Sequence, residues 1–181
     1  MNIAVVAYPM MDDADLHWIS TFRKKHDTQS FRIGVHFTLV FPVEGSPSEL
    51  ASEIAAVARS IDPIAFAIRR TEIVCDALRN RSLVFLVPDE GALEITTLHN
   101  RLYAGVLRPY LRADIAFVPH LTIGAAAESS AGQRAAAELD VEVEHHELGA
   151  VVGRVGIRVV VAADVERLDH RRGGGSGRLG G

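Results

Sequence analysis

Cysteine, aromatic residues and long apolar runs are all scarce in this chain of 181 residues. The single cysteine, Cys75, excludes an internal disulfide and a zinc site built from cysteines alone, and we interpret it as a small buried apolar side chain. No apolar run approaches the roughly 18 residues that a membrane helix needs. The N-terminal MNIAVVAYPMMDD has no basic segment ahead of its apolar stretch, so it reads as a strand rather than a signal peptide. We therefore expect a cytoplasmic protein without a membrane partner.

An excess of positive charge is also missing. Lys and Arg number 19 against 23 Asp and Glu, which gives a net charge of −4. Proteins that hold long nucleic acids by bulk electrostatics usually carry a basic excess, so this class of protein is disfavoured. A small phosphorylated ligand needs only a local cluster of donors and remains compatible with the composition. No phosphate-binding loop or dinucleotide fingerprint occurs, because the glycine run GGGSG lacks the strand and helix that such motifs require.

The apolar pattern predicts strands and helices in the order β-α-β-α-β-β-α-β-α-β-β. Strands are expected over 2–8, 32–42, 63–76, 81–88 and 115–127 and as a pair within 141–168, and helices over 12–27, 46–62, 89–111 and 129–140. This order repeats a strand, a helix and a histidine-bearing strand, so we predict one α+β domain over 1–168 built from a duplicated unit. The glycine-rich tail 169–181 has no periodic pattern and is expected to be disordered.

Two of the predicted strands carry the same short pattern. VHFTLVFP contains His36 and Thr38, and PHLTIGA contains His120 and Thr122. Side chains alternate along a strand, so each histidine shares a face with its threonine while apolar residues fill the other face. With eight histidines in the chain, chance gives roughly 0.09 matches to His-x-Thr-aliphatic, so two matches are unlikely to be accidental. If the two halves pack about a pseudo-two-fold axis, both pairs converge on one cleft.

Two histidines and two threonines suit the cleavage of a phosphoester. In-line cleavage of a P–O bond needs a base at the attacking oxygen and an acid at the leaving oxygen. Histidine serves both tasks because its ordinary pKa of about 6.5 allows either protonation state near neutrality. Threonine hydroxyls can donate hydrogen bonds to the non-bridging phosphoryl oxygens. No metal and no other cofactor is required when one histidine is cationic.

HFTLVFP and PHLTIG, 84 residues apart, resemble the paired motifs of the 2H phosphoesterase superfamily, the group of the 2′-5′ RNA ligase-like proteins and cyclic phosphodiesterases. The resemblance spans about residues 1–165. It implies a bilobal α+β fold with antiparallel sheets flanking a central cleft, and metal-free catalysis. It also implies that His36 and His120 are catalytic and that Thr38 and Thr122 bind the substrate phosphate, without saying which histidine is the base.

The resemblance implies a phosphodiesterase that hydrolyses a 2′,3′-cyclic or 2′-5′ ribose phosphate on RNA ends or small nucleotides. We expect it to act as a monomer. Two alternatives stay open: a ligase that joins 2′-5′ RNA ends, and a binding module for nucleotide or RNA without turnover. Candidate phosphate contacts are Arg32, Arg154 and Arg158, and candidate base-stacking residues are Tyr8, Phe41 and Phe117, although core packing is the simpler interpretation of the phenylalanines.

The remaining charged features have simpler interpretations. EHHE at 144–147 is a poor metal site because adjacent histidines on a strand point to opposite faces. His17, His26, His99 and His170 are expected to be solvated on helix surfaces or in the tail. FRKKH at 22–26 lies at a predicted helix end, where cations favour the helix dipole, and it could also touch RNA phosphates.

Overall fold

The computed structural model describes residues 2–27, 29–76, 81–126 and 151–158 of the chain. Its elements in chain order are β1 (Asn2–Met11), α1 (Asp13–His26), β2 (Phe37–Glu44), α2 (Pro47–Arg59), β3 (Ile64–Asp76), β4 (Arg81–Glu90), α3 (Ala92–Leu102), a short 3-10 helix (Arg108–Tyr110), β5 (Leu121–Ala126) and β6 (Val151–Arg158). The predicted helix at 129–140, the first strand of the predicted last pair and the tail 169–181 lie outside the described residues.

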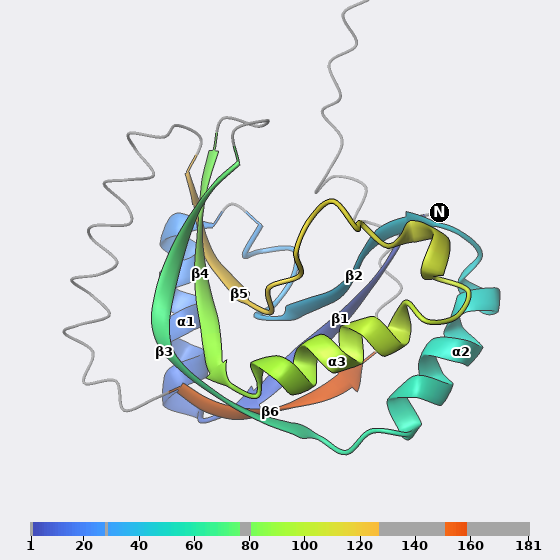
Figure 1. Ribbon diagram of the computed structural model, residues 1–181. Coiled ribbons are helices and arrows are strands. Elements are labelled where there is room, and N and C mark those ends of the chain that lie inside the picture. Colours follow the sequence, from blue (N-terminus) through green and yellow to red (C-terminus); the bar gives the residue numbers. More distant parts are fainter. Residues whose placement is uncertain (1, 28, 77–80, 127–150, 159–181) are drawn as a thin grey trace, which may run out of the picture.

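The six described strands form one closed antiparallel ring in the order β1-β2-β5-β4-β3-β6 (Figure 1). The ring closes between β2 and β5 through one registered pair, so on its β5 side most of β2 has no neighbour among the described strands. The predicted α+β class is therefore confirmed, with antiparallel strands throughout. The division of residues 1–168 into two pseudo-symmetric lobes stays a prediction.

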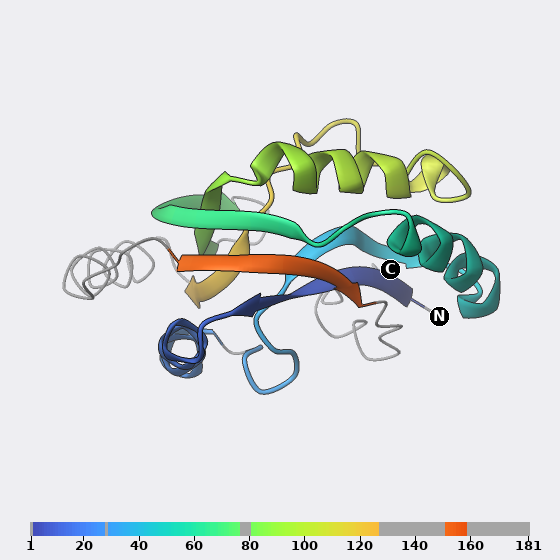
Figure 2. The ribbon, with the colours of Figure 1, turned by 90° about the horizontal axis from the view of Figure 1, so that it is seen from below.

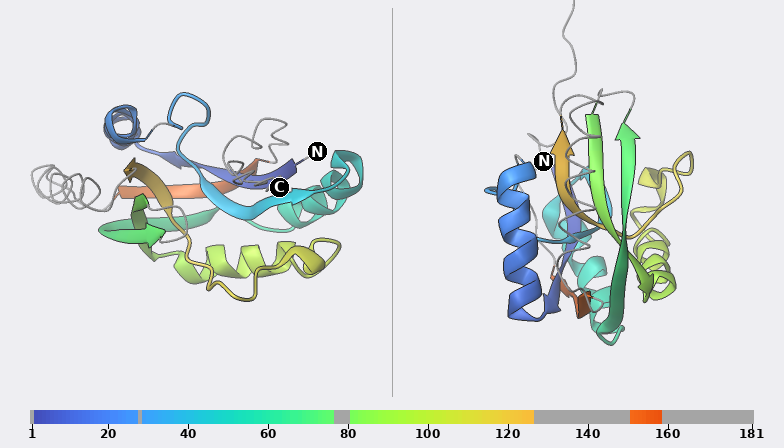
Figure 3. Two further views of the ribbon diagram at one scale, coloured as in Figure 1. Left: turned by 90° about the horizontal axis from the view of Figure 1, so that it is seen from above. Right: turned by 90° about the vertical axis from the view of Figure 1, so that its left-hand side faces the viewer.

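The helices lie on the outside of this ring. Figures 2 and 3 show α1 and α3 on opposite sides of the strands, and α1 packs on β5 while α3 packs on β2, β3 and β4. Alternate residues of the strands and one face of each of these helices share a core that includes Phe22, Phe37, Phe66 and Leu98. None of the helices in the described part of the chain is long and apolar enough to cross a membrane.

The extent of strand pairing differs around the ring. β3 and β4 are in register over most of their length, whereas β2 and β5 meet at one registered pair, Phe37 opposite Leu121. Both side chains are fully buried, and the Phe37 ring meets Phe66 edge-on at 5.3 Å between ring centroids. These two residues are the middle positions of the two His-x-Thr motifs. Core packing at the middle residue therefore fixes both motifs at the junction of β2 and β5.

The first two helices agree with the sequence analysis. The predicted helix at 12–27 is α1, whose first turn is capped by the Asp12 carboxylate accepting from the Ala14 N–H at 2.7 Å. The predicted helix at 46–62 is α2, with Pro47 in its first turn. The first strand, by contrast, does not stop at Pro9. It continues to Met11 because its pairing with β2 ends at Ala7, which leaves Pro9 paired on the β6 side alone, a position that tolerates proline.

The predicted helix at 89–111 was too long. α3 begins after Gly91, whose φ of 78° and close approach to the Ala65 carbonyl exclude a side chain, and it ends at Leu102. Its buried face consists of Ile95, Leu98, His99 and Leu102, whereas Leu93 in the first turn is 75 % exposed.

The two motif strands are shorter than predicted. β2 starts at Phe37 and β5 at Leu121, so each begins immediately after its histidine. The backbone before each histidine bends, and the carbonyl two residues before the histidine accepts a hydrogen bond from the imidazole ring.

Candidate active site

The two motifs lie crosswise at the junction of β2 and β5. Phe37 is opposite Leu121 in the one registered antiparallel pair of β2 and β5. Extending this register by one residue beyond the start of each strand pairs His36 with Thr122 and His120 with Thr38. All four side chains are half-buried. They alternate with Phe37 and Leu121, which point into the core, so the four share the other face. We call this surface the motif face.

Each histidine ring is held by the same local hydrogen bond. The His36 Nδ1–H donates to the Gly34 carbonyl at 2.8 Å, and the His120 Nδ1–H donates to the Val118 carbonyl at 2.7 Å. A carbonyl oxygen can only accept, so Nδ1 carries the proton in both rings. The Nε2 atom of each histidine therefore remains to take up or deliver a proton.

The electrostatic surroundings of the two rings differ. Burial is the main cause that lowers the pKa of His36, the charges of Arg23 and His120 lower it further, and Asp27 raises it. Burial also lowers the pKa of His120, but there Glu72 acts in the opposite direction. The effect of His120 on the pKa of His36 is consistent with two imidazoles on the same face of the sheet.

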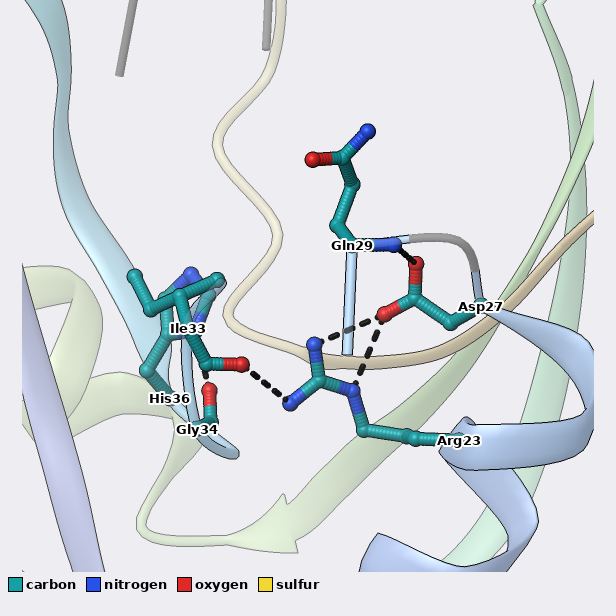
Figure 4. Close-up of polar contacts among 6 residues, drawn as sticks. All are labelled: Arg23, Asp27, Gln29, Ile33, Gly34 and His36. Atoms are coloured by element: carbon teal, nitrogen blue, oxygen red, sulfur yellow. Dashed lines mark hydrogen bonds and ion pairs between the residues drawn. The ribbon is translucent and has the colours of Figure 1, made fainter. Parts of the chain in front are cut away.

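A buried ion pair supports the segment that leads to His36 (Figure 4). Arg23, which is 3 % exposed, donates from Nε and Nη2 to Asp27 Oδ2 at 3.0 and 2.7 Å and from Nη1 to the Ile33 carbonyl at 3.1 Å. The other Asp27 oxygen accepts from the Gln29 N–H at 2.9 Å. Arg23 therefore does not contact solvent as the basic stretch FRKKH suggested. It joins the end of α1 to the residues just before His36.

His120 is supported by an aromatic ring. Phe85 of β4 lies opposite Thr122 and stacks on the His120 ring, with 3.7 Å between ring centroids and 22° between planes. Glu72 of β3 lies opposite Phe85, so Glu72, Phe85 and Thr122 form one row across three neighbouring strands. Arg70 makes an ion pair with Glu72. Neither Phe85 nor Glu72 could be found from the local sequence pattern, because the order of the strands in the ring decides which residues are neighbours.

The other candidates are spread around the ring. Tyr8 lies beside His36, with 6.3 Å between ring centroids, so it borders the motif face. Phe117 stacks on His99 and Phe41 is partly exposed. Arg32 and Arg154 are exposed, and Arg158 is in register with Val6 of β1.

His99 is not on the surface. It is 3 % exposed, which overturns the expectation that it is solvated. Its place follows from helical spacing, since residues 95, 98, 99 and 102 lie at steps of three and four and form one face of α3. Of the other histidines expected to be solvated, His17 is exposed and His26 is half-buried against Phe22.

Within the described ranges, no group of three His, Cys, Asp or Glu side chains is arranged to hold a metal ion. The EHHE segment at 144–147 lies outside those ranges. The motif face offers imidazoles and hydroxyls, which suit proton transfer and hydrogen bonding to an anion.

Comparison with known proteins identifies the family of the chain. Residues 11–159 match the family described as the 2′-5′ RNA ligase superfamily. A Bacillus cereus (strain B4264) protein named "Putative phosphoesterase BCB4264_A1283" is 30 % identical over 129 residues, covering 68 % of this chain and 69 % of that protein. A Geobacillus thermodenitrificans protein named "Putative phosphoesterase" is 25 % identical over 127 residues, with the same coverage. The chain thus belongs to the 2′-5′ RNA ligase superfamily of 2H phosphoesterases, the group that its two motifs resemble.

Proposed function

We propose that this protein is a metal-independent phosphodiesterase that hydrolyses a 2′,3′-cyclic or 2′-5′ ribose phosphate on RNA ends or small nucleotides. The observation that carries the proposal is the crosswise pair of His-x-Thr motifs around Phe37 and Leu121. The names of the relatives, which describe phosphoesterases, support the same class of reaction.

The reaction needs one neutral and one protonated histidine. For a cyclic phosphate, the neutral Nε2 removes a proton from water as the water oxygen bonds to phosphorus. The protonated Nε2 of the second histidine gives its proton to the departing ribose oxygen as that P–O bond breaks. The product is a ribose phosphomonoester, and the two histidines have exchanged protonation states. Thr38 and Thr122 donate hydrogen bonds to the non-bridging oxygens, where negative charge grows.

The surroundings of the rings favour one assignment of roles. Glu72 favours a proton on His120, whereas Arg23 disfavours a proton on His36. We therefore assign His36 as the base and His120 as the acid in hydrolysis. In both rings the Nδ1–H donates to a backbone carbonyl, so each ring acts through Nε2.

The two alternatives predict different results. A ligase would join a 2′,3′-cyclic phosphate end to a 5′-hydroxyl end: the hydroxyl oxygen gives its proton to the base and bonds to phosphorus as the P–O3′ bond breaks and O3′ takes a proton from the acid, which leaves a 2′-5′ linkage. A binding module would hold nucleotide equally well after both histidines are replaced, because binding does not require an acid and a base. An enzyme would lose rate far more than affinity.

The test is a panel of 2′,3′-cyclic nucleotides and 2′-5′ dinucleotides, incubated with purified protein in EDTA, with the 2′- and 3′-phosphate products resolved. His36→Ala and His120→Ala should each lower kcat by about 10²–10⁴-fold. His17→Ala, at an exposed histidine of α1, is the matched control and should leave kcat unchanged. Loss of turnover in EDTA with recovery on adding a metal would refute the metal-independent mechanism, and nucleotide binding without any turnover would favour the binding module.

A further inference from the structure

The edge of β2 changes partner just after the first motif. At Phe37 its neighbour is β5, but the chain that would continue alongside β2, at residues 117–119, is not a strand. The next backbone groups on this edge are met by side chains of α3. The Leu39 carbonyl accepts from the His99 Nδ1–H at 2.7 Å, and the Phe41 N–H donates to the Tyr103 hydroxyl at 3.2 Å. Two side chains thus replace a missing strand.

His99 also contacts the segment that leads to the second motif. Its ring stacks on Phe117, with 3.7 Å between ring centroids and 9° between planes. Leu39 directly follows Thr38, and Phe117 lies three residues before His120. One buried side chain therefore contacts the backbone next to the first motif and the segment that leads into the second.

The chemistry of His99 suits a fixed structural contact. Burial lowers its pKa and so disfavours the charged ring, and Nδ1 carries a proton because the Leu39 carbonyl can only accept. Held in this way, the ring donates one hydrogen bond from Nδ1 and presents a flat face to Phe117 at the same time. Tyr103 packs beside it, with 4.8 Å between ring centroids.

We propose that His99 is a positioning residue that holds the two His-x-Thr motifs at the spacing that catalysis requires, through its hydrogen bond to Leu39 and its stacking on Phe117. The proposal rests on the proposed function, since it names a residue that supports the same site. Displacing a catalytic group by about 1 Å can lower a rate by about 100-fold, so one contact that spans both motifs can control turnover.

Two substitutions separate the two contacts. His99→Phe keeps a ring for Phe117 but loses the donor to Leu39, while His99→Asn keeps an amide N–H near the position of Nδ1 but loses the ring. We expect His99→Phe to lower kcat about tenfold to 100-fold with KM changed less than threefold, and His99→Asn to recover part of that loss. His17→Phe, at the exposed histidine of α1, should match the unaltered protein. A kcat for folded His99→Phe equal to that of the unaltered protein would overturn the proposal.

A second measurement does not depend on turnover. Nitrogen NMR of the imidazoles reports the surroundings of His36 and His120, and both signals should shift in His99→Phe but not in His17→Phe. Unchanged signals would overturn the positioning role even if no substrate had been found. If His99→Phe does not fold, Phe117→Leu tests the stacking contact from the other side, and it should also shift the His120 signal. Absence of turnover by the unaltered protein, with these shifts present, would count against the proposed function alone.

Discussion

Phe37 and Leu121 lie directly opposite each other, fully buried, at the one registered pair that joins β2 to β5. Each is the middle residue of a His-x-Thr motif, so the same pair closes the ring of strands and sets the relation between the two motifs. Fold stability and the geometry of the candidate active site therefore depend on the same two side chains.

Shortening either side chain should affect both properties. We expect Phe37→Ala to lower the free energy of unfolding by about 3–5 kcal/mol and Leu121→Ala by about 2–5 kcal/mol, since each leaves a cavity in the core. Urea unfolding measures both values. Leu93→Ala, at a leucine of α3 that is 75 % exposed, should change it by less than about 0.5 kcal/mol. A loss at Phe37 no larger than at Leu93 would contradict the importance of this junction.

The assigned roles of the histidines can be tested with the leaving group. Nitrophenolate leaves without protonation, so a nitrophenyl phosphodiester needs a base but little help from an acid. We expect His120→Ala to lose about 10²–10⁴-fold in kcat on a 2′,3′-cyclic nucleotide but much less on bis(p-nitrophenyl) phosphate. His36→Ala should lose activity on both substrates. The reverse pattern would exchange the two roles.

The pH dependence of kcat/KM follows from the lowered pKa values of both histidines. The base is lost as pH falls through the pKa of His36, and the acid is lost as pH rises through that of His120. Because both are lowered from about 6.5, we expect a bell-shaped profile with its maximum below pH 6.5.

A single substitution should move one side of this profile. Glu72 raises the pKa of His120, so Glu72→Gln should move the alkaline limb to lower pH and leave the acidic limb in place. Glu94→Gln, at an exposed residue of α3, is the control. Movement of the acidic limb instead would contradict the assignment of His120 as the acid.

The buried ion pair of Arg23 and Asp27 should matter far more than an exposed one. Arg23→Met leaves the Asp27 carboxylate buried without its partner, and we expect a loss of about 3–5 kcal/mol in the free energy of unfolding. Adding Asp27→Asn, which still accepts from the Gln29 N–H, should recover part of that loss. Arg112→Met breaks an exposed pair with Asp114, whose charges are screened by water, and should leave the free energy of unfolding nearly unchanged. Equal losses at both pairs would refute the supporting role of Arg23.

The sequence predicts the local features well because they depend on neighbouring residues. The position of α1 and the alternation of His36, Phe37 and Thr38 follow from short-range patterns alone. The partner of each strand does not, since the position of Phe85 on His120 depends on the order of β4 and β5 in the ring. The burial of His99 was only partly predictable. Its helical spacing with Ile95 and Leu102 indicates the buried face of α3, but its polar side chain favours a surface position.

The crosswise arrangement of the motifs has a consequence for substrate choice. A local two-fold axis between Phe37 and Leu121 exchanges His36 with His120 and Thr38 with Thr122. In the proposed reaction, a phosphodiester turned end over end therefore meets the same set of groups at phosphorus. Which ester bond breaks must then be decided by residues outside the motifs, such as Tyr8 beside His36 and Glu72 near His120, where the two halves of the site differ.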